Sequence, residues 1–591
     1  MSGVGVRTTL LVIAALGVGA LVTGSLLLNA AVPDAPGVPD FGLLDHHGRF
    51  HQLSRYASAR AVVLYAHDAA CPSARDGLGL LADVRRRVGE PAVVLAIDAN
   101  TRDDRATLAR GAAQAGVDIP ILQDRTQLVT QTLEVARSGE AIVLDPRTWR
   151  IAYRGTLVDV ANHDQRRLTD AIRALIEGRA GPGEARPATS GGCPIAWAEG
   201  MSAKAAAVSY AADVVPILRA KCLGCHHQGG IGSWPMDSYE RVKTWSPRMR
   251  VALLTGRMPP WHADPAIGVF ANDRSLSVEQ ARTLVRWIDA GAPRRADPDP
   301  LPAVPAPAAP EWPLGRPDVV VELPAQDIPA TGTLPYRYIH VPAPVSADAW
   351  VRAVHIMPRN ARVMHHAILT VDYPATSEHA QPHWHGGAGG FFATYAPGLP
   401  PMPFPPDSGG LLPAGSTLVF QLHYTAVGEA TTDRPRAAFY FHPRPPALAA
   451  QIVAGFNFDF TIPPGAEDQP AEAAYVLDRP VTLNGFAPHM HFRGKRFRYE
   501  AQYPDGRHEV LLSVPRYDFN WQTFYLLEPP KAVPAGTKIV MQGAFDNSAR
   551  NPANPDPTKA VHWGEQTWDE MFVGYMLYTV PRRGEGPGVA H

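Results

Sequence analysis

The chain has 591 residues, which is too long for one hydrophobic core and predicts about three to five domains of about 100 to 200 residues each. Its formal net charge is -1 and 19% of its residues are charged, so the composition excludes a strongly basic protein that binds nucleic acid. The 59 prolines predict Pro-rich linkers and loop-rich β-domains.

The N-terminal segment has the composition of an export signal. After Arg7 there is no charge in "TTLLVIAALGVGALVTGSLLLNAAV", which ends at Val32. A run of this length can span a bilayer, while the small residues of "LNAA" suit a signal peptidase. We therefore expect residues 1–32 to be either a cleaved signal peptide or a retained inner-membrane anchor. Both alternatives place the rest of the chain in the periplasm or on its membrane.

Residues 33–180 alternate short apolar strands, such as "AVVLYAHD" and "EAIVLD", with helical stretches, which predicts an α/β domain. The stretch "YAHDAACPSARDGL" resembles the thioredoxin-like redoxin family, in which a cysteine lies at a turn from strand to helix. Here Ala74 stands where a second cysteine is expected, and Gly139 stands where a proline is expected. We therefore expect no dithiol oxidoreductase. Cys71 could act as a one-cysteine peroxidase, pair with Cys193 in a disulfide, or belong to a degenerate scaffold.

The motif Cys-Leu-Gly-Cys-His at Cys222, Cys225 and His226 has the spacing that attaches a haem through two thioethers and binds its iron through the histidine. A helix is predicted from Ser277, where Ser277 and Gln280 form a capping box, to the Gly-Ala-Pro that begins at Gly291. After a linker at 181–202, this order of features over 203–297 resembles class I cytochrome c. The resemblance implies an all-α domain with one haem c per chain.

A sixth iron ligand is expected in the loop before that last helix. "GRMPPWHAD" offers Met258, followed by two prolines, and Met258 resembles the cytochrome c methionine. Met236, Met249 and His262 are alternative ligands, whereas His227 is expected to be only a neighbour of the haem-binding histidine.

A Pro/Ala-rich spacer at 298–316 precedes about 270 residues of short alternating strands and Pro/Gly turns, the pattern of β-sandwiches. We expect two all-β, jelly-roll-like domains at 317–447 and 448–582, followed by a tail at 583–591. The sequence "GFAPHMHFRGKRF" is interpreted as one strand, which would present His489 and His491 on the same face.

Histidines and methionines recur through these two domains. Imidazoles with one thioether suit copper that cycles between Cu(II) and Cu(I), since sulfur favours the reduced state. The candidate copper ligands are His365, His366, His423, His489, His491 and Met571. Adjacent histidines of a regular strand point to opposite faces, so His365 and His366 require a bulge or a strand end. "SEHAQPHWHGG" is either a further metal site, with His379, His383 and His385, or an exposed His-rich loop.

The order of these segments over 317–582 resembles the copper type II monooxygenases, the peptidylglycine α-hydroxylating and dopamine β-monooxygenase family. The shared features are the adjacent histidines, the "QLHY", the His-x-His before Gly-Lys, and the "DEM". The resemblance implies two coppers per chain. His365, His366 and His423 would bind the electron-storing copper, and His489, His491 and Met571 would bind the copper that activates dioxygen, with Tyr575 beside it.

The resemblance implies hydroxylation of a small organic substrate with dioxygen. Ala487 and Val573 replace residues that hold a substrate carboxylate in the peptidylglycine enzyme, so a peptide C-terminus is not expected as substrate. We expect the haem to deliver electrons that come from an external donor, either an ascorbate-like reductant or a respiratory redox protein. The alternative is a non-enzymatic multidomain protein that carries electrons or binds copper.

Overall fold

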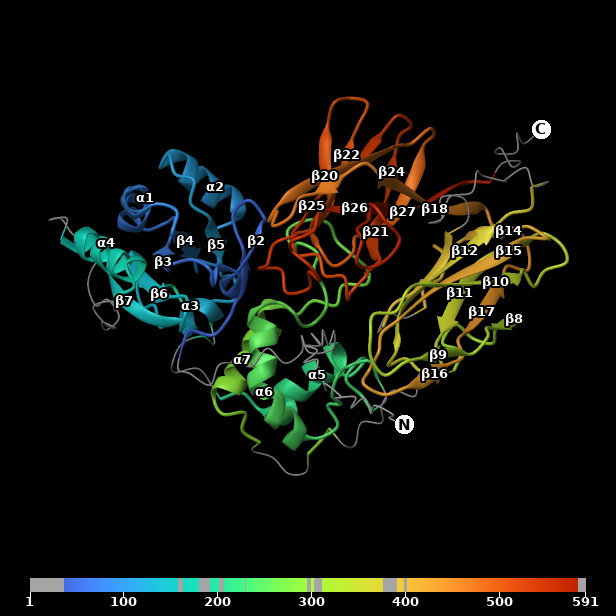
Figure 1. Cartoon of the computed structure of the whole chain (residues 1–591), viewed down its shortest axis with the longest axis horizontal. Helices are drawn as coiled ribbons and strands as arrows, with labels where there is room; N and C mark the ends of the chain where they lie inside the picture. The colour runs from blue at the N-terminus through green and yellow to red at the C-terminus, as the bar shows by residue number, and fades with distance from the viewer. Residues whose placement is uncertain are drawn as a thin grey trace, which may run out of the picture.

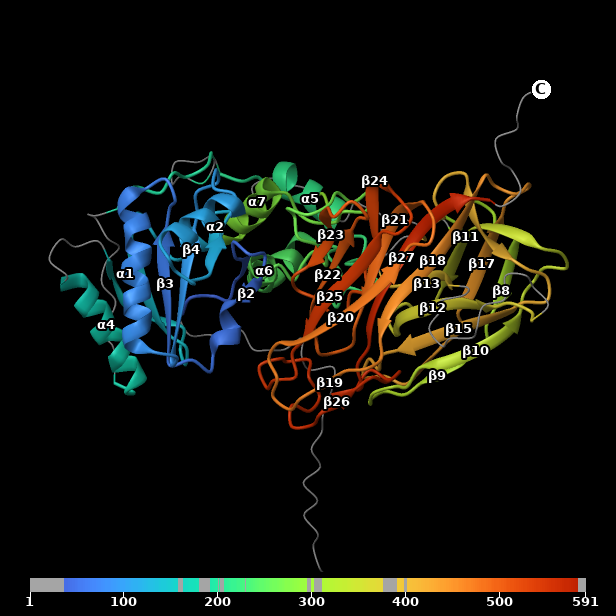
Figure 2. The ribbon, with the colours of Figure 1, turned by 90° about the horizontal axis from the view of Figure 1, so that it is seen from above.

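The computed structural model of the chain describes residues 37–157, 163–179, 192–199, 201, 207–228, 230–294, 299–301, 311–375, 391–397 and 401–582. An α/β domain lies at one end, and two β-sandwiches lie side by side at the other (Figures 1 and 2). A helical segment contacts both parts. In these ranges no helix is both long and apolar enough to cross a membrane, and the predicted signal or anchor lies outside them.

The α/β domain has a five-stranded sheet in the order β5-β4-β3-β6-β7, in which β3, β4 and β5 are parallel. Every residue of β3 is buried, as expected for a central strand covered on both faces. The predicted α/β domain is therefore confirmed. Its elements are β1 (Gly42–Leu44), β2 (Phe50–Gln52), η2 (Leu53–Tyr56), β3 (Ala61–His67), α1 (Pro72–Val88), β4 (Ala92–Asp98), α2 (Arg105–Gln114), β5 (Ile121–Gln123), α3 (Leu128–Thr132), β6 (Glu140–Asp145), β7 (Arg150–Thr156) and α4 (His163–Ile176).

The helical segment contains η3 (Tyr210–Val214), α5 (Val215–Lys221), α6 (Tyr239–Leu254) and α7 (Val278–Asp289). The capping box predicted for the last helix is present, because the side chain of Ser277 accepts from the backbone of Gln280 and Gln280 reaches back to the backbone of Ser277. Leu284, Val285 and Ile288 are buried along one face of α7. Local sequence signals were sufficient to locate this helix.

The first sandwich packs β8, β11, β14 and β17 against β10, β12, β13 and β15 over one apolar core. Its strands are β8 (Val319–Glu322), β9 (Gln326–Ile328), β10 (Arg337–Pro342), β11 (Ala349–Met357), β12 (Met364–Asp372), β13 (Phe391–Tyr395), β14 (Ser408–Leu412), β15 (Thr417–Tyr424), β16 (Thr431–Asp433) and β17 (Arg436–Phe441). Most of these strands are antiparallel, so each buries one face and leaves the other toward solvent or a neighbouring element.

The second sandwich packs β18, β21, β24 and β27 against β20, β22, β23 and β25. A short parallel pairing of β14 with β18 joins the layers of the two sandwiches into one eight-stranded sheet. The strands are β18 (Leu448–Asn457), β19 (Thr461–Ile462), β20 (Gln469–Val476), β21 (Val481–His489), β22 (Gly494–Gln502), β23 (His508–Val514), β24 (Tyr525–Val533), β25 (Lys538–Phe545), β26 (Val561–His562) and β27 (Phe572–Pro581).

The loop between α6 and α7 is attached to the second sandwich. The backbone N–H of Ala271 donates to the carbonyl of Leu526 at 2.9 Å, and the N–H of Glu528 donates to the carbonyl of Val269 at 2.9 Å. Phe270 is buried in the core of that sandwich. The loop that carries Met258 is therefore held between the helical segment and the β-region.

Candidate metal centres and cysteine sites

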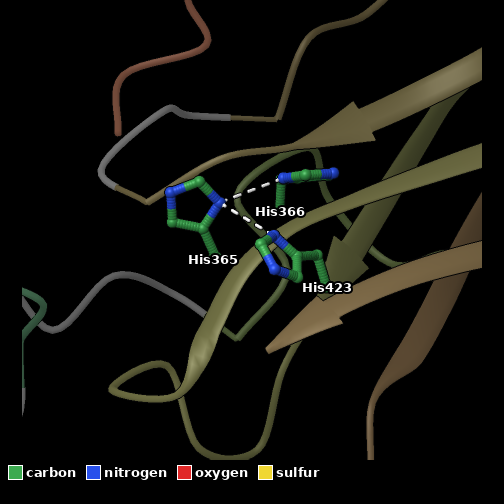
Figure 3. A group of neighbouring side chains, drawn as sticks. All are labelled: His365, His366 and His423. Carbon is green, nitrogen blue, oxygen red and sulfur yellow. Dashed lines mark hydrogen bonds between the residues drawn. The ribbon is translucent and has the colours of Figure 1, made fainter. Parts of the chain in front are cut away.

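Three histidines of the first sandwich converge. His366 of β12 and His423 of β15 are register partners, and the register shifts between Met364 and His366. This bulge at the start of β12 brings His365 to the same place, as the adjacent pair requires. The Nδ1 of His365 lies 3.1 Å from that of His366 and 3.3 Å from that of His423 (Figure 3).

These separations fit a metal. Two nitrogens that lie 2.0–2.1 Å from one ion at about 90 to 120° are about 2.9 to 3.6 Å apart. Burial lowers the pKa of His365 to about 4 and that of His423 to about 2, and it also lowers the pKa of His366 well below its usual value. The three rings are therefore neutral at pH 7. Neutral imidazoles whose nitrogens face one another need a shared proton or a cation between them.

The second histidine pair lies in the second sandwich. The prediction of one strand through both histidines is wrong, because β21 ends at His489 and His491 lies in the connection to β22. Tertiary contacts orient the rings instead. Nδ1 of His489 donates to Oε1 of Gln522 at 2.9 Å, and Nδ1 of His491 donates to the carbonyl of Asp569 at 3.3 Å. Both Nε2 atoms remain as the ring nitrogens for a metal, and the ring centroids lie 5.2 Å apart.

A buried carboxyl group holds the backbone at the second histidine of the His-x-His segment. Glu570 is fully buried, and its two oxygens accept from the backbone N–H groups of His491, at 2.8 Å, and Arg493, at 2.5 Å. Burial raises the pKa of Glu570 to about 8. The carboxyl group of Glu570 therefore positions the backbone of His491. The next residue, Met571, is 8% exposed and carries the thioether.

Met571 belongs to a buried apolar cluster at the start of β27, together with Val573 and Tyr575. His489 and Val573 are register partners of β21 and β27, and the ring of Tyr575 lies 6.5 Å from that of His489. The residues predicted for the second centre therefore come from the same end of two paired strands.

Two aromatic rings lie against both histidine groups. Tyr336, which precedes β10, has its ring 4.8 Å from that of His423 and 6.3 Å from that of His491. Phe519 stacks on His365 at 4.8 Å and lies 5.9 Å from His491. The two histidine groups therefore face each other where the sandwiches meet. Sequence patterns did not indicate either aromatic residue, since aromatic side chains of β-domains are usually in the core.

In the predicted haem motif, neighbouring groups hold the histidine ring in one orientation. Cys222 and Cys225 are free thiols. Nδ1 of His226 donates to the carbonyl of Trp234 at 2.9 Å, which leaves Nε2 for iron. Gly232 passes so close that a Cβ there would lie 2.7 Å from the His226 ring, so only glycine fits. His227 instead donates to the carbonyl of Leu223.

The candidates for the sixth ligand differ in their surroundings. Met258 is half-buried in the loop after α6, whereas Met236 is 5% exposed in the helical core and Met249 packs against that core. Nε2 of His262 accepts from Arg516 at 2.6 Å. Met258 therefore lies outside the packed helical core, in the loop where a ligand was predicted.

Cys71 and Cys193 form a disulfide. Of the alternatives for Cys71, pairing is thus the one observed, and Cys71 is 1% exposed at the start of α1. The N–H of Ser138 donates to the carbonyl of Cys193 at 2.8 Å, and the N–H of Ile195 donates to the carbonyl of Ala136 at 3.0 Å. The segment around Cys193 is therefore held to the α/β domain by backbone hydrogen bonds as well as by the disulfide. The loop histidines His379, His383 and His385 lie outside the described residues.

Comparison with known protein families gives a match for the α/β domain. Residues 36–160 match the AhpC/TSA family, so the chain contains a thioredoxin-like domain of that type. No curated protein matches the chain in sequence.

Several solved structures match about a quarter of this chain. A hypothetical protein from Sinorhizobium meliloti is 22% identical over 27% of this chain and 93% of its own, with a TM-score of 0.24. Peroxidoxin BcpB from Mycobacterium tuberculosis is 21% identical over 24% of this chain and 96% of its own, with a TM-score of 0.21. A putative thiol:disulfide interchange protein DsbE from Chlorobium tepidum is 17% identical over 24% of this chain and 95% of its own, with a TM-score of 0.22.

Proposed function

We propose that the protein is an exported copper-dependent monooxygenase that hydroxylates a small organic substrate with dioxygen. One copper would be bound by His365, His366 and His423. The other would be bound by His489, His491 and Met571. A haem c on Cys222, Cys225 and His226 would supply electrons, which an ascorbate-like reductant or a respiratory redox protein provides from outside.

The observation that carries the proposal is the arrangement of imidazole nitrogens on both sides of one contact between sandwiches. Three Nδ1 atoms converge on the first side. On the second side, the Nδ1 hydrogen bonds of His489 and His491 leave their Nε2 atoms as the nitrogens for a metal. Imidazole suits both oxidation states of copper, and the thioether of Met571 favours Cu(I). The second set has three donors, which leaves a coordination position open for an exogenous ligand.

Copper bound there would supply one-electron redox chemistry and an affinity for dioxygen. The chain supplies the surroundings. Gln522 and Asp569 fix which ring nitrogen of His489 and His491 remains for the metal, and Glu570 holds the backbone of His491 and Arg493. The neighbouring side chains of Met571, Val573 and Tyr575 are buried and largely apolar, so water is excluded on this side of the centre.

The attachment of the helical segment to the β-region supports electron delivery from a haem to the copper domains. The loop between α6 and α7 donates to and accepts from backbone groups of the second sandwich. A haem attached at Cys222 and Cys225 would therefore be tethered to the copper domains at high effective concentration.

The test is copper loading of the full-length haem protein followed by measurement of copper content, carbon monoxide binding after reduction, and oxygen uptake with analysis of products. About two coppers per chain, carbon monoxide bound at one of them, and oxygen consumption coupled to a hydroxylated product are expected. Full copper content with neither carbon monoxide binding nor oxygen uptake would instead favour the non-enzymatic electron carrier or copper-binding protein.

A further inference from the structure

We propose that Tyr336 is a further residue of the centre formed by His489, His491 and Met571, and that its phenol donates a hydrogen bond to an exogenous ligand of that metal. The inference rests on the proposed function, since it assumes that copper binds there. It adds a polar group from the first sandwich to a centre whose other residues all belong to the second.

The position of the phenol oxygen carries the proposal. It lies 3.5 Å from Nε2 of His491. Nδ1 of the same ring is taken by the carbonyl of Asp569, so Nε2 is the nitrogen that remains for the metal. The phenol therefore lies beside the ligand atom itself, on the side of His491 that faces the other sandwich. A metal held by this nitrogen would have the phenol within reach of one further ligand.

The surroundings of Tyr336 fix this position. Its side chain is 7% exposed, and its ring packs edge-to-face against the rings of His423, at 4.8 Å, and His366, at 5.5 Å. Its backbone N–H donates to Oε1 of Gln566, which belongs to the second sandwich, at 3.4 Å. The ring packing restricts the side chain, and the backbone bond ties the residue to the segment that leads to Met571. The phenol is thus presented to the second centre from a defined direction.

A hydrogen-bond donor at this place has a specific chemical use. An anionic ligand on the metal gains a charge-assisted hydrogen bond, which is stronger than a bond between neutral groups. Because the donor comes from the first sandwich, this stabilisation exists only while the two sandwiches are in contact. The inference therefore predicts that anion binding at one copper depends on a residue of the other domain.

The chain provides a matched control two residues away. Tyr338 lies on the exposed part of β10 and is 38% exposed. Its hydroxyl accepts from Nε2 of Gln421 at 2.8 Å and donates to Glu565 at 3.4 Å. Tyr338→Phe removes a phenol hydroxyl two residues further along the chain, where it makes no contact with His491. It therefore controls for general effects of losing a phenol near this interface.

The experiment titrates azide into the copper-loaded Cu(II) forms of wild type, Tyr336→Phe and Tyr338→Phe, read by absorption and electron paramagnetic resonance. Phenylalanine keeps the packed ring, so about two coppers per chain and an unchanged signal from the three-histidine copper are expected in all three. Loss of one charge-assisted hydrogen bond should weaken azide binding at the other copper about tenfold in Tyr336→Phe only. Equal azide affinity in all three proteins would overturn the inference and leave the proposed function intact.

A second measurement does not depend on the Tyr336→Phe variant. The protein is labelled with 3-fluorotyrosine and carries Tyr575→Phe, which removes the other tyrosine beside the centre. Electron–nuclear double resonance is then expected to show the fluorine of Tyr336 coupled to the Cu(II) bound by His489, His491 and Met571. Absence of coupled fluorine from a chain with two coppers overturns the inference alone. A wild-type chain that lacks copper at His489 and His491 overturns the proposed function, and the inference falls with it.

Discussion

His366 and His423 are register partners on the antiparallel strands β12 and β15, and their rings lie 5.0 Å apart, centroid to centroid. This pairing brings residues 57 positions apart in the chain into one cluster, to which the bulge before His366 adds His365. The cluster lies against Tyr336 and Phe519, which also contact His491 of the second sandwich. Two candidate metal centres therefore share one interface, while their ligands belong to different sandwiches.

Substitutions of ligands at the two candidate copper centres should have different effects on copper content and carbon monoxide binding. Met571→Ala removes the thioether that favours Cu(I), so carbon monoxide binding by the reduced protein should weaken at least tenfold while the three-histidine copper stays bound. His423→Ala should lower the copper content from about two to about one per chain and leave carbon monoxide binding in place. Mass spectrometry and infrared spectroscopy measure both effects. If both variants keep full copper and full carbon monoxide binding, the assignment of ligands is wrong.

Haem should remain on the chain after denaturation. Thioether bonds to Cys222 and Cys225 would be covalent, so a denaturing gel stained for haem should show colour at the mass of the chain. Replacement of both cysteines by alanine should abolish the stain, whereas Cys193→Ala should retain it. Extraction of the wild-type haem by acidified solvent would refute covalent attachment.

Met258→Ala should remove the soft axial ligand of the haem iron. The expected result is loss of the sulfur-to-iron charge-transfer band and a lower reduction potential, because methionine ligation raises the potential. Met236→Leu is the control, since Met236 packs in the helical core. A band that persists in Met258→Ala and disappears in Met236→Leu or Met249→Leu would move the ligand to that residue.

The Cys71–Cys193 disulfide should stabilise the α/β domain without acting as a catalyst. It closes a loop across 122 residues, and the chain-entropy model assigns such a loop a few kcal/mol. Cys193→Ser should therefore lower the free energy of unfolding of this domain by about 2–4 kcal/mol, measured by denaturant titration. Because Ala74 replaces a second thiol, neither the wild type nor the variant should catalyse insulin reduction. Rapid insulin reduction would contradict this.

Asp98 should make the α/β domain less stable as pH rises. Burial, reinforced by the nearby Asp103, raises its pKa from 3.8 to about 8 in the folded state. The folded protein then holds this proton more tightly than the unfolded chain, so the associated stability is complete below about pH 4 and is lost as pH rises through about 8. Asp98→Asn stays neutral and should raise the melting temperature by about 2–4 °C at pH 8.5.

The same substitution should have little such effect at pH 4, where Asp98 is protonated in the folded protein and about half protonated in the unfolded chain. Differential scanning calorimetry at the two pH values separates this titration from a change in packing. An equal gain in melting temperature at both values would show that the carboxylate charge is not the cause.

Local sequence was sufficient for much of the fold. The apolar runs at Ala61–His67 and Ala92–Asp98 predicted strands because a buried parallel strand needs apolar residues on both faces. Ser277 and Gln280 predicted the start of α7 because a capping box involves only neighbouring residues. The haem motif is likewise defined within five residues. These features depend on contacts between residues close together in the chain, and composition or spacing reports such contacts directly.

Only the tertiary structure shows which residues far apart in the chain contact one another. It paired Cys71 with Cys193, ended β21 at His489 where alternation had predicted a continuing strand, and used Asp569 and Glu570 to orient His491. It also placed Tyr336 beside that histidine. Each of these contacts joins residues tens to hundreds of positions apart. Their geometry depends on how two sandwiches pack against each other, and no periodicity within a single strand records that packing.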